Sequence, residues 1–388
     1  MRRLLSALIA LSLITFGSAF IEAGAGAAKC AGKVISGYCI APHANLPGVN
    51  LSHANLSHTN LNGANLLGAN LLGANLSHAN LTGDLLTGAN LNGANLQGAH
   101  LSGAYLQGTN LQYANLSGDS LRGDDLTGAN LSHANLTSAN LSHTNLLEAG
   151  LNNAIMTGAN LAGANFAGTN LQGTNLTQAN LSRTIVGDAN LSHANLTSAN
   201  LQGASLGGAN LQGTNLQGAN LTGANLSYAN LTSDLLQGAI LSRAFMNDTN
   251  LFNARLDGAN LTAAVLVGAV LQGANLSNAN LTSANLRGTN LAGANLIKAI
   301  LTNASLLYAN LSGANLSGYD LSGYDLSHTN LSGANLSNAN LTNANLFNTQ
   351  LINTNLAGAL LSGDNLNNAD MTGAICPNGI VHLGGGNC

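Results

Sequence analysis

Leucine recurs at every fifth residue of this chain from Leu46 to Met371, without an insertion or a deletion. The series has 66 positions, and the only departures from leucine are Met156, Phe166, Val186, Met246 and Met371. In the stretch SGANLSNANLTNANL, Ala stands two residues before each leucine and Asn stands one residue before it. We call the leucine position i, so that Ala and Asn occupy i−2 and i−1. A repeat this strict constrains the fold more than any other feature of the sequence.

A five-residue period fits neither of the common elements. On an α-helix the leucines would spiral around every face, because each step of five advances about 140° beyond a full turn. On a continuous strand, successive leucines would point to opposite faces, because side chains alternate. The leucines share one interior only if the chain turns a corner within each repeat. The period therefore predicts a polygonal β-coil with one side per five residues.

The other positions of the repeat agree with this coil. Within a short extended side, i and i−2 point the same way, so Leu and Ala face inward and Asn at i−1 faces outward. Gly and Asn are frequent at i+2, where a corner requires turn dihedrals. Pro is absent between Gly48 and Gly373, as expected where coil-to-coil hydrogen bonds use the backbone N–H groups. The number of sides in one turn stays open on these grounds.

The A-N-L-x-x units from Ala44 to Met371 resemble the pentapeptide-repeat family. This resemblance covers most of the chain, and it implies an all-β fold, a right-handed quadrilateral parallel β-helix of about 16 coils. The rod would be about 80 Å long at ~4.8 Å per coil. Such a rod needs caps at its exposed ends. The stretches GYCIAPHANL and AICPNGIVHLGGGNC resemble the flanks of exported members of this family.

The first 28 residues have the layout of a secretory signal peptide. Arg2 and Arg3 precede an apolar run from Leu4 to Phe16, and small residues follow it. The run is shorter than the roughly 20 apolar residues of a membrane span, so we favour a cleaved signal over a membrane anchor and expect no span after its removal. The sequence thus predicts a signal peptide (1–28), an N-terminal cap (29–43), the repeat β-helix (44–373) and a C-terminal cap (374–388), in a protein that is secreted, periplasmic or on the cell surface.

All four cysteines lie outside the regular repeats. Cys30 and Cys39 precede them, and Cys376 and Cys388 follow them. An exported chain reaches an oxidising compartment, so pairing within each end is the simplest arrangement. Zinc binding by all four is disfavoured, because the rod would hold the two pairs far apart.

A few inward i−2 positions hold residues that do not suit an apolar core. These are Asp84, Asp119, Asp124, Asp234, Asp364, Tyr319 and Tyr324. Since an unpaired buried carboxylate is costly, we interpret them as marks of local bulges, of partly open corners or of side chains bonded to backbone N–H groups. Histidines cluster at i+2, and His58 and His78 are predicted to stack on adjacent coils as solvated residues rather than as metal ligands. The sequence predicts neither a metal site nor a cofactor.

The outward i−1 row becomes apolar in one region. The residues concerned are Leu235, Ile240, Phe245, Val265 and Val270. With 20 residues per coil, Phe245 and Val265 would stack, with Ile240 and Val270 flanking them. Contiguous exposed apolar surface indicates a partner site, so these residues form the candidate contact, weighed against relaxed selection or a local dent in the rod.

Composition narrows the function. Only 6% of the residues are charged, and the chain without residues 1–28 carries a net charge of about −5. Along a rod of about 80 Å, the density of negative charge is far below DNA's one charge per ~1.7 Å. This low density disfavours the DNA mimicry by which some cytosolic members of the family bind type II topoisomerase. The chain also lacks the excess of positive charge that would attract nucleic acid. No catalytic motif can be distinguished from the residues that the repeat itself supplies. The sequence favours a non-enzymatic exported scaffold that presents Asn, Ser and Thr ladders to an unknown protein, envelope or matrix component, with binding of an ordered surface (polysaccharide or ice) as the alternative.

Overall fold

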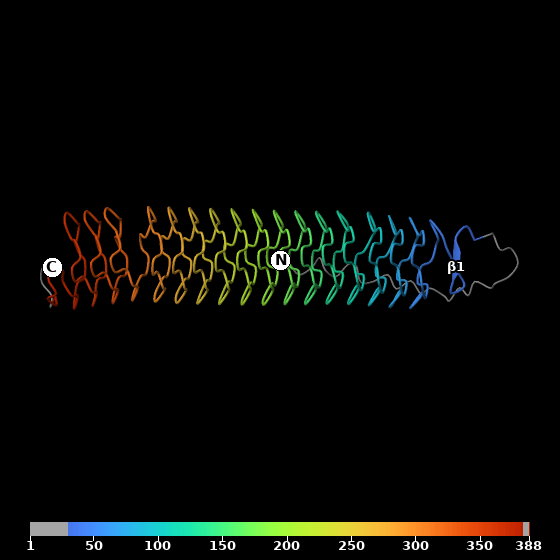
Figure 1. The fold of residues 1–388 in the computed structure, drawn as a ribbon, viewed down its shortest axis with the longest axis horizontal. Helices are drawn as coiled ribbons and strands as arrows, with labels where there is room; N and C mark the ends of the chain where they lie inside the picture. The colour runs from blue at the N-terminus through green and yellow to red at the C-terminus, as the bar shows by residue number, and fades with distance from the viewer. Residues whose placement is uncertain (1–29, 383–387) are drawn as a thin grey trace, which may run out of the picture.

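The computed structural model describes residues 30–382 and 388. The described chain winds into one long rod, with the N-terminal cap at one end and the C-terminal residues at the other (Figure 1). Parallel bridges join i−1 residues that are 20 positions apart, such as Asn55 with Asn75 and Asn75 with Asn95. Four five-residue sides therefore complete one turn, and the fold is the expected right-handed quadrilateral parallel β-helix. The predicted signal peptide lies outside the described residues.

The hydrogen bonds of one repeat explain its sequence, because each of the five N–H groups has its own acceptor. Leu221, Gly223 and Asn225 donate to carbonyls of neighbouring coils over 2.7–3.0 Å. Ala224 donates to the carbonyl of Leu221 across the turn, at 3.0 Å. The fifth N–H, that of Thr222, donates to the side-chain oxygen of Asn220 at 3.1 Å. Asn at i−1 thus satisfies the one donor that coil winding leaves over.

The positions of the prolines agree with this hydrogen-bond pattern. All three prolines, Pro42, Pro47 and Pro377, occupy i+1 in the five-residue frame. The N–H at i+1 is the one that bonds only to the Asn side chain, so its loss leaves the coil-to-coil ladder intact. The sequence argument that the coil-to-coil ladder excludes proline therefore holds for three of the five positions, and the hydrogen bond across the turn excludes it from a fourth.

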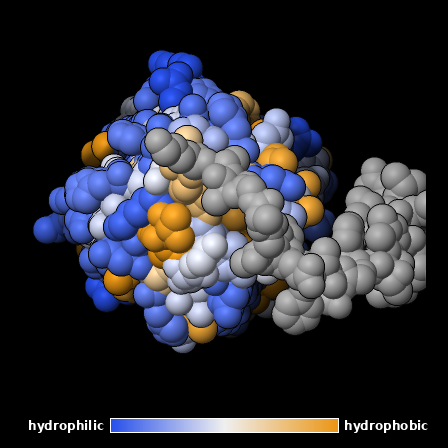
Figure 2. Space-filling model, turned by 90° about the vertical axis from the view of Figure 1, so that its right-hand side faces the viewer, coloured by the Kyte–Doolittle hydropathy of each residue, from blue (hydrophilic) through white to orange (hydrophobic). Residues whose placement is uncertain are grey.

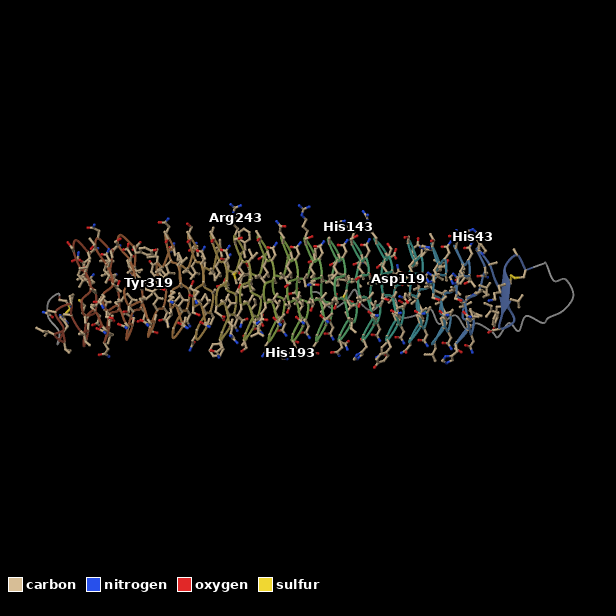
Figure 3. The ribbon with its side chains drawn as sticks, viewed as in Figure 1. His43, Asp119, His143, His193, Arg243 and Tyr319 are labelled. Atoms are coloured by element: carbon tan, nitrogen blue, oxygen red, sulfur yellow. A yellow bond between two sulfur atoms is a disulfide. The ribbon has the colours of Figure 1, made fainter. Side chains whose placement is uncertain are left out.

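The corners use left-handed backbone at i+2, as expected from the abundance of Gly and Asn there. Gly203 has a φ of 64° and Asn253 a φ of 54°. Gly adopts this region without steric cost and Asn tolerates it better than most residues. Figure 3 shows the consequence of the 20-residue turn: His43, His143 and Arg243 lie along one edge of the rod, and His193 lies on the opposite edge.

The core is a column of Leu and Ala with side chains that are almost entirely buried. Phe166 is the largest fully buried side chain, at 0% exposure. The residue one coil later in the same column is Val186, which is smaller than the usual leucine. A large and a small residue on facing layers preserve the packing density.

We expect Phe166→Ala to lower the free energy of unfolding by about 3–5 kcal/mol, because it leaves a cavity in a fully buried column. Phe245→Ala is the matched control, since the Phe245 side chain is 50% exposed and its loss should cost less than about 1 kcal/mol. Chemical denaturation followed by far-UV circular dichroism measures both. Equal losses for the two variants would contradict the assignment of Phe166 to the core.

Both ends carry small antiparallel caps with a disulfide. At the N-terminus, β1 (Lys33–Ile35) pairs with β2 (Tyr38–Ile40), and Cys30 bonds to Cys39. At the C-terminus, Ile375 pairs with Val381 in antiparallel fashion, and Cys376 bonds to Cys388. The structure therefore contains both disulfides that the sequence predicts.

The stacking is interrupted once along the rod. Among the described residues, no bridges join Asn295 to Asn315, Ile300 to Asp320 or Ser305 to Asp325, as the 20-residue repeat requires. On the remaining side, the bridges Asn290–Asn310 and Asn310–Asn330 continue. We call the opening between residues 295–306 and 315–325 the open seam. It is visible as a wide gap in the orange part of the ribbon (Figure 1).

Candidate interaction surfaces

The Asn rows that run along the rod are largely occupied with one another. Asn115 is half-buried; it donates to the Oδ1 of Asn95 at 3.1 Å and accepts from Asn135 at 3.1 Å and from the N–H of Ser117 at 3.2 Å. Such amide ladders stabilise the stack. Little of each amide's hydrogen-bonding capacity is left for a partner. A partner would therefore contact mainly the corner residues at i+1 and i+2.

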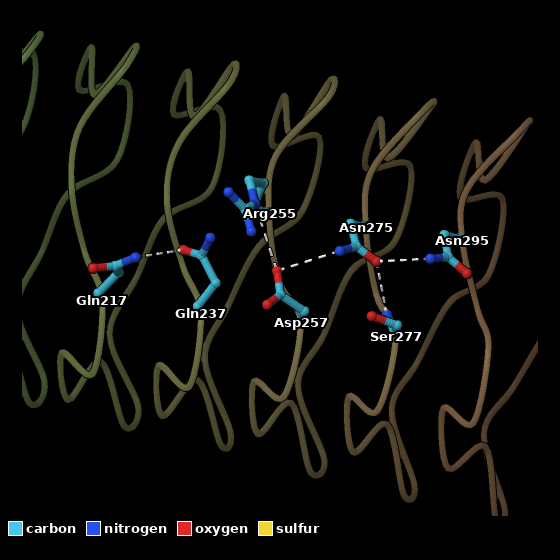
Figure 4. A network of polar contacts seen from close by, with 7 residues as sticks. All are labelled: Gln217, Gln237, Arg255, Asp257, Asn275, Ser277 and Asn295. Carbon is cyan, nitrogen blue, oxygen red and sulfur yellow. Dashed lines mark hydrogen bonds and ion pairs between the residues drawn. The ribbon is translucent and has the colours of Figure 1, made fainter.

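One side of the rod interrupts its Asn row with a charged network (Figure 4). Arg255 and Asp257 form an ion pair of 3.7 Å, and Asn275 donates to Asp257 at 3.3 Å. The row continues with Asn295, which donates to Asn275 at 3.0 Å, and it stops there because the open seam begins. The Arg255 side chain is 56% exposed, and an exposed ion pair of this kind stabilises the rod little.

The five residues of the predicted apolar contact do not form one patch. Phe245 and Val265 are bridged on one side of the rod, as expected. The order of sides places Ile240 and Val270 on the two neighbouring sides, where corners separate them from the pair. Leu235 is two sides away from Phe245, on the opposite side of the rod, and is half-buried. The geometry thus reduces the candidate contact to the pair Phe245 and Val265.

The side that carries this pair has a shallow depression of about 350 Å³. Its floor consists of small residues, including Gly203, Ser205 and Gly223, and the ring of Phe245 closes one end. The same side carries further exposed apolar residues at i−1, namely Leu85, Tyr105 and Ile185. The N-terminal view shows the general character of the surface, which is mostly hydrophilic with separate hydrophobic spots (Figure 2).

Rings stack along several corners. His58 and His78 stack with ring centroids 5.0 Å apart, as predicted, and Tyr113 and His133 repeat the arrangement at 4.9 Å. In residues 30–382 and 388, no group of three or more His, Cys, Asp or Glu side chains could hold a metal ion. The same residues contain no helix long and apolar enough to cross a membrane.

Four of the five inward aspartates, all except Asp364, bond to backbone N–H groups, which is one of the interpretations drawn from the sequence. Asp84 accepts from Ala64 at 3.0 Å, and Asp234 accepts from Thr214 at 2.9 Å. Desolvation by burial outweighs these bonds and raises the pKa of both carboxyls to about 8. At neutral pH, these two side chains are therefore mostly protonated.

Asp119 and Asp124 stand at consecutive inward positions and loosen the stack. Their carboxyls accept from the N–H groups of Gly98 at 2.6 Å and of Gly103 at 2.8 Å, in place of the carbonyls that usually bind this N–H. Burial raises the pKa of both carboxyls to about 7. Asp119 is 2% exposed, and Figure 3 shows the places of Asp119 and Tyr319 along the length of the rod.

Tyr319 and Tyr324 occupy the same two inward positions ten turns later and line the open seam. The seam holds a cavity of about 420 Å³. The Tyr319 hydroxyl donates to the carbonyls of Leu296 and Ala299, and the Tyr324 hydroxyl donates to that of Leu301. The sequence marks both tyrosines as misfits, but the extent of the opening was missed. The signal is that two large residues follow one another in a single coil.

Comparison with known families gives one match. The family model described as Pentapeptide repeats (8 copies) matches segments that together cover residues 44–375, except for single residues between segments. These residues are Asp84, Asp124, Asp234 and Tyr319. The gaps therefore coincide with inward misfits of the rod.

Several solved structures resemble the chain. HetL, a pentapeptide repeat protein involved in heterocyst differentiation regulation in the cyanobacterium Nostoc sp., is 33% identical over 71% of this chain and 92% of its own, with a TM-score of 0.17. A trypsin-treated form of QnrB1, a plasmid-mediated fluoroquinolone resistance protein, is 21% identical over 49% of this chain and 88% of its own, with a TM-score of 0.26. A pentapeptide repeat protein from the Arabidopsis thaliana thylakoid lumen is 31% identical over 30% and 71%, with a TM-score of 0.12. No curated protein sequence matches the chain.

Proposed function

Since the chain belongs to the pentapeptide-repeat family, we propose that it is a non-enzymatic exported scaffold that contacts a protein or an envelope component. The observation that carries this proposal is the pair of disulfides, Cys30–Cys39 and Cys376–Cys388, one at each end of the rod. Disulfides of this kind persist in oxidising compartments. The signal-like segment at residues 1–28 supports the same location.

The surface chemistry supports a scaffold rather than an electrostatic binder. The Asn side chains are held in ladders, so the rod offers straight rows of corner side chains at a regular spacing. Phe245 and Val265, beside the shallow depression, are the apolar contact of this proposal. The regular rows also favour the alternative partner, an ordered surface such as a polysaccharide or ice. Thermal hysteresis and glycan pull-down assays test that alternative.

Fractionation of the producing cells tests the scaffold proposal. We expect the protein in the culture fluid or the cell envelope, with its first 28 residues removed and no thiol available to a maleimide label before reduction. Leu8→Arg combined with Leu11→Arg, which interrupts the apolar run of the leader, is the matched control that should retain the chain inside the cell. Cross-linking of the exported protein then identifies its neighbours. Full-length reduced protein in the cytosol of unmodified cells would overturn the proposal.

A further inference from the structure

The lips of the open seam carry backbone groups that are paired in a regular stack. In the ordinary stack, Leu291 donates to the carbonyl of Asn310 at 2.7 Å, and Asn310 donates to that of Thr289 at 2.9 Å. The corresponding N–H groups at the seam have no hydrogen bond within the described part of the chain. They belong to Leu296, Leu301 and Leu306 on one lip and to Asn315, Asp320 and Asp325 on the other.

The two tyrosines hold the lips apart. A Thr at an inward position elsewhere, such as Thr249, donates to the carbonyl 23 residues earlier, that of Leu226, at 2.8 Å in an intact stack. Tyr319 and Tyr324 donate to the equivalent carbonyls, those of Leu296 and Leu301, but an aromatic ring lies between the backbone and the hydroxyl. The same bond made with a longer side chain requires a wider separation of the coils.

One edge of the seam stays closed. Tyr308 and His328 stack across it with ring centroids 4.8 Å apart, and the N–H of Tyr308 donates to the carbonyl of Ser327 at 3.4 Å. The guanidinium of Arg287 lies 5.3 Å from the centre of the Tyr308 ring, which adds a cation–π contact. The corner at the other end of the intact side is closed as well, because the N–H of Gly293 donates to the carbonyl of Ser312 at 3.0 Å. The seam is therefore a cleft that is hinged along one side of the rod and open on the other three.

We propose that the open seam binds an extended segment of a partner polypeptide. The two facing β-edges carry unpaired N–H groups and C=O groups without a backbone donor. Such edges are complementary to an extended peptide backbone, which adds to them as a strand. A polysaccharide supplies hydroxyl groups but not this alternation of donors and acceptors.

Charge narrows the class of peptide, because the two lips together carry one cation, Lys298, and two carboxylates, Asp320 and Asp325. Asp320 is exposed at the mouth of the cavity, and its carboxylate has no ion pair among the described residues. A Lys or Arg side chain on the bound segment would complement it. The inference rests on the proposed scaffold function and names the site and the chemistry of the partner.

Selection from a phage library of random hexapeptides, followed by binding measurements with the selected synthetic peptides, tests the proposal on the full exported protein. We expect enrichment of peptides that contain Lys or Arg, and at least tenfold weaker binding to Tyr319→Ala/Tyr324→Ala. Thr249→Ala is the matched control, because it removes an inward hydroxyl from an intact stack, and it should bind normally. Peptides with Pro in place of a central residue should bind at least tenfold less, since Pro removes a backbone donor.

Two further measurements keep the test independent of how well the double variant folds. Asp320→Asn keeps the acceptor for Ser322 and Asn340 and should weaken binding of the basic peptides several-fold. Hydrogen exchange should slow at least tenfold at the amides of Leu301 and Asp320, which line the cavity on one side of the rod, when peptide is added. No enriched peptide, equal binding by Tyr319→Ala/Tyr324→Ala, or protection of these amides by a soluble polysaccharide such as xylan but by no peptide would overturn the proposal. An exported rod that binds no peptide would leave the scaffold function standing, whereas cytosolic retention would remove that function itself.

Discussion

The rod should lose stability as the pH rises from about 4 to 8. Burial raises the pKa of Asp84 and Asp234 from 3.8 to about 8, and that of Asp119 and Asp124 to about 7. Below pH 3.8, these carboxyls are protonated in both the folded and the unfolded state, so the free energy of unfolding does not depend on their ionisation. Above this pH, they ionise in the unfolded chain first, so the unfolded state gains on the folded one until the pH passes the folded pKa. The slope is at most about 1.4 kcal/mol per pH unit for each carboxyl.

Other aspartates do not cancel this trend. Hydrogen bonds to the exposed carboxylates of Asp320 and Asp370 lower their pKa values below 3.8. Their contribution is present above the unfolded pKa and is lost only as the pH falls below it. The two effects therefore act in different pH windows. Between pH 4 and 8, the four buried carboxyls determine how the free energy of unfolding changes.

Thermal unfolding at a series of pH values, followed by far-UV circular dichroism, measures this effect. Asp84→Asn combined with Asp234→Asn should flatten the curve and should raise the melting temperature at pH 8 but not at pH 4. Asp248→Asn is the control, because Asp248 is an exposed corner residue, and it should leave the slope unchanged. A wild-type melting temperature that is constant or increasing between pH 5 and 8 would contradict the protonated state of the buried carboxyls.

The regular part of this fold could be predicted from the sequence because one local rule repeats. Leu at i, a small residue at i−2 and Gly or Asn at i+2 each follow from a single repeat, and the structure contains all three. The disulfide pairs could also be predicted, because the two short end segments each hold two cysteines. The number of sides came from the resemblance, since a period of five does not set how many repeats close a turn.

The candidate site was harder to predict because it depends on relations between coils. The five apolar residues look adjacent in the sequence, yet successive i−1 positions lie on successive sides of the rod, so only Phe245 and Val265 meet. A single inward misfit such as Asp84 is accommodated by one backbone bond. Two large misfits in one coil, Tyr319 and Tyr324, instead separate it from the preceding coil. Whether the coil separates depends on whether two neighbouring sides move away from the preceding coil at the same time. A rule for single repeats does not describe this.

Replacing both seam tyrosines by alanine should therefore stabilise the rod. Ala is the usual residue at i−2, so Tyr319→Ala/Tyr324→Ala restores the regular repeat and lets the two lips stack. The six N–H groups that are unpaired at the seam would form hydrogen bonds worth about 0.5–1.5 kcal/mol each. This gain is opposed by the loss of the packing of two half-buried rings. We expect a net gain of roughly 2 kcal/mol or more in the free energy of unfolding, together with slower hydrogen exchange at Leu296 and Leu301.

The controls separate closure of the seam from simple loss of contacts. Tyr319→Phe/Tyr324→Phe keeps both rings and removes the hydroxyls that bond to Leu296 and Leu301, so it should destabilise the rod by about 1–3 kcal/mol without closing the seam. Tyr319→Ala alone should gain less than half of the double variant's effect, because Tyr324 still separates the lips and neighbouring substitutions are not additive. If the lips cannot move, the double alanine variant leaves a cavity and costs about 3–5 kcal/mol or more. The sign of its effect thus decides whether the tyrosines prop the seam open or fill an opening that the rest of the rod imposes.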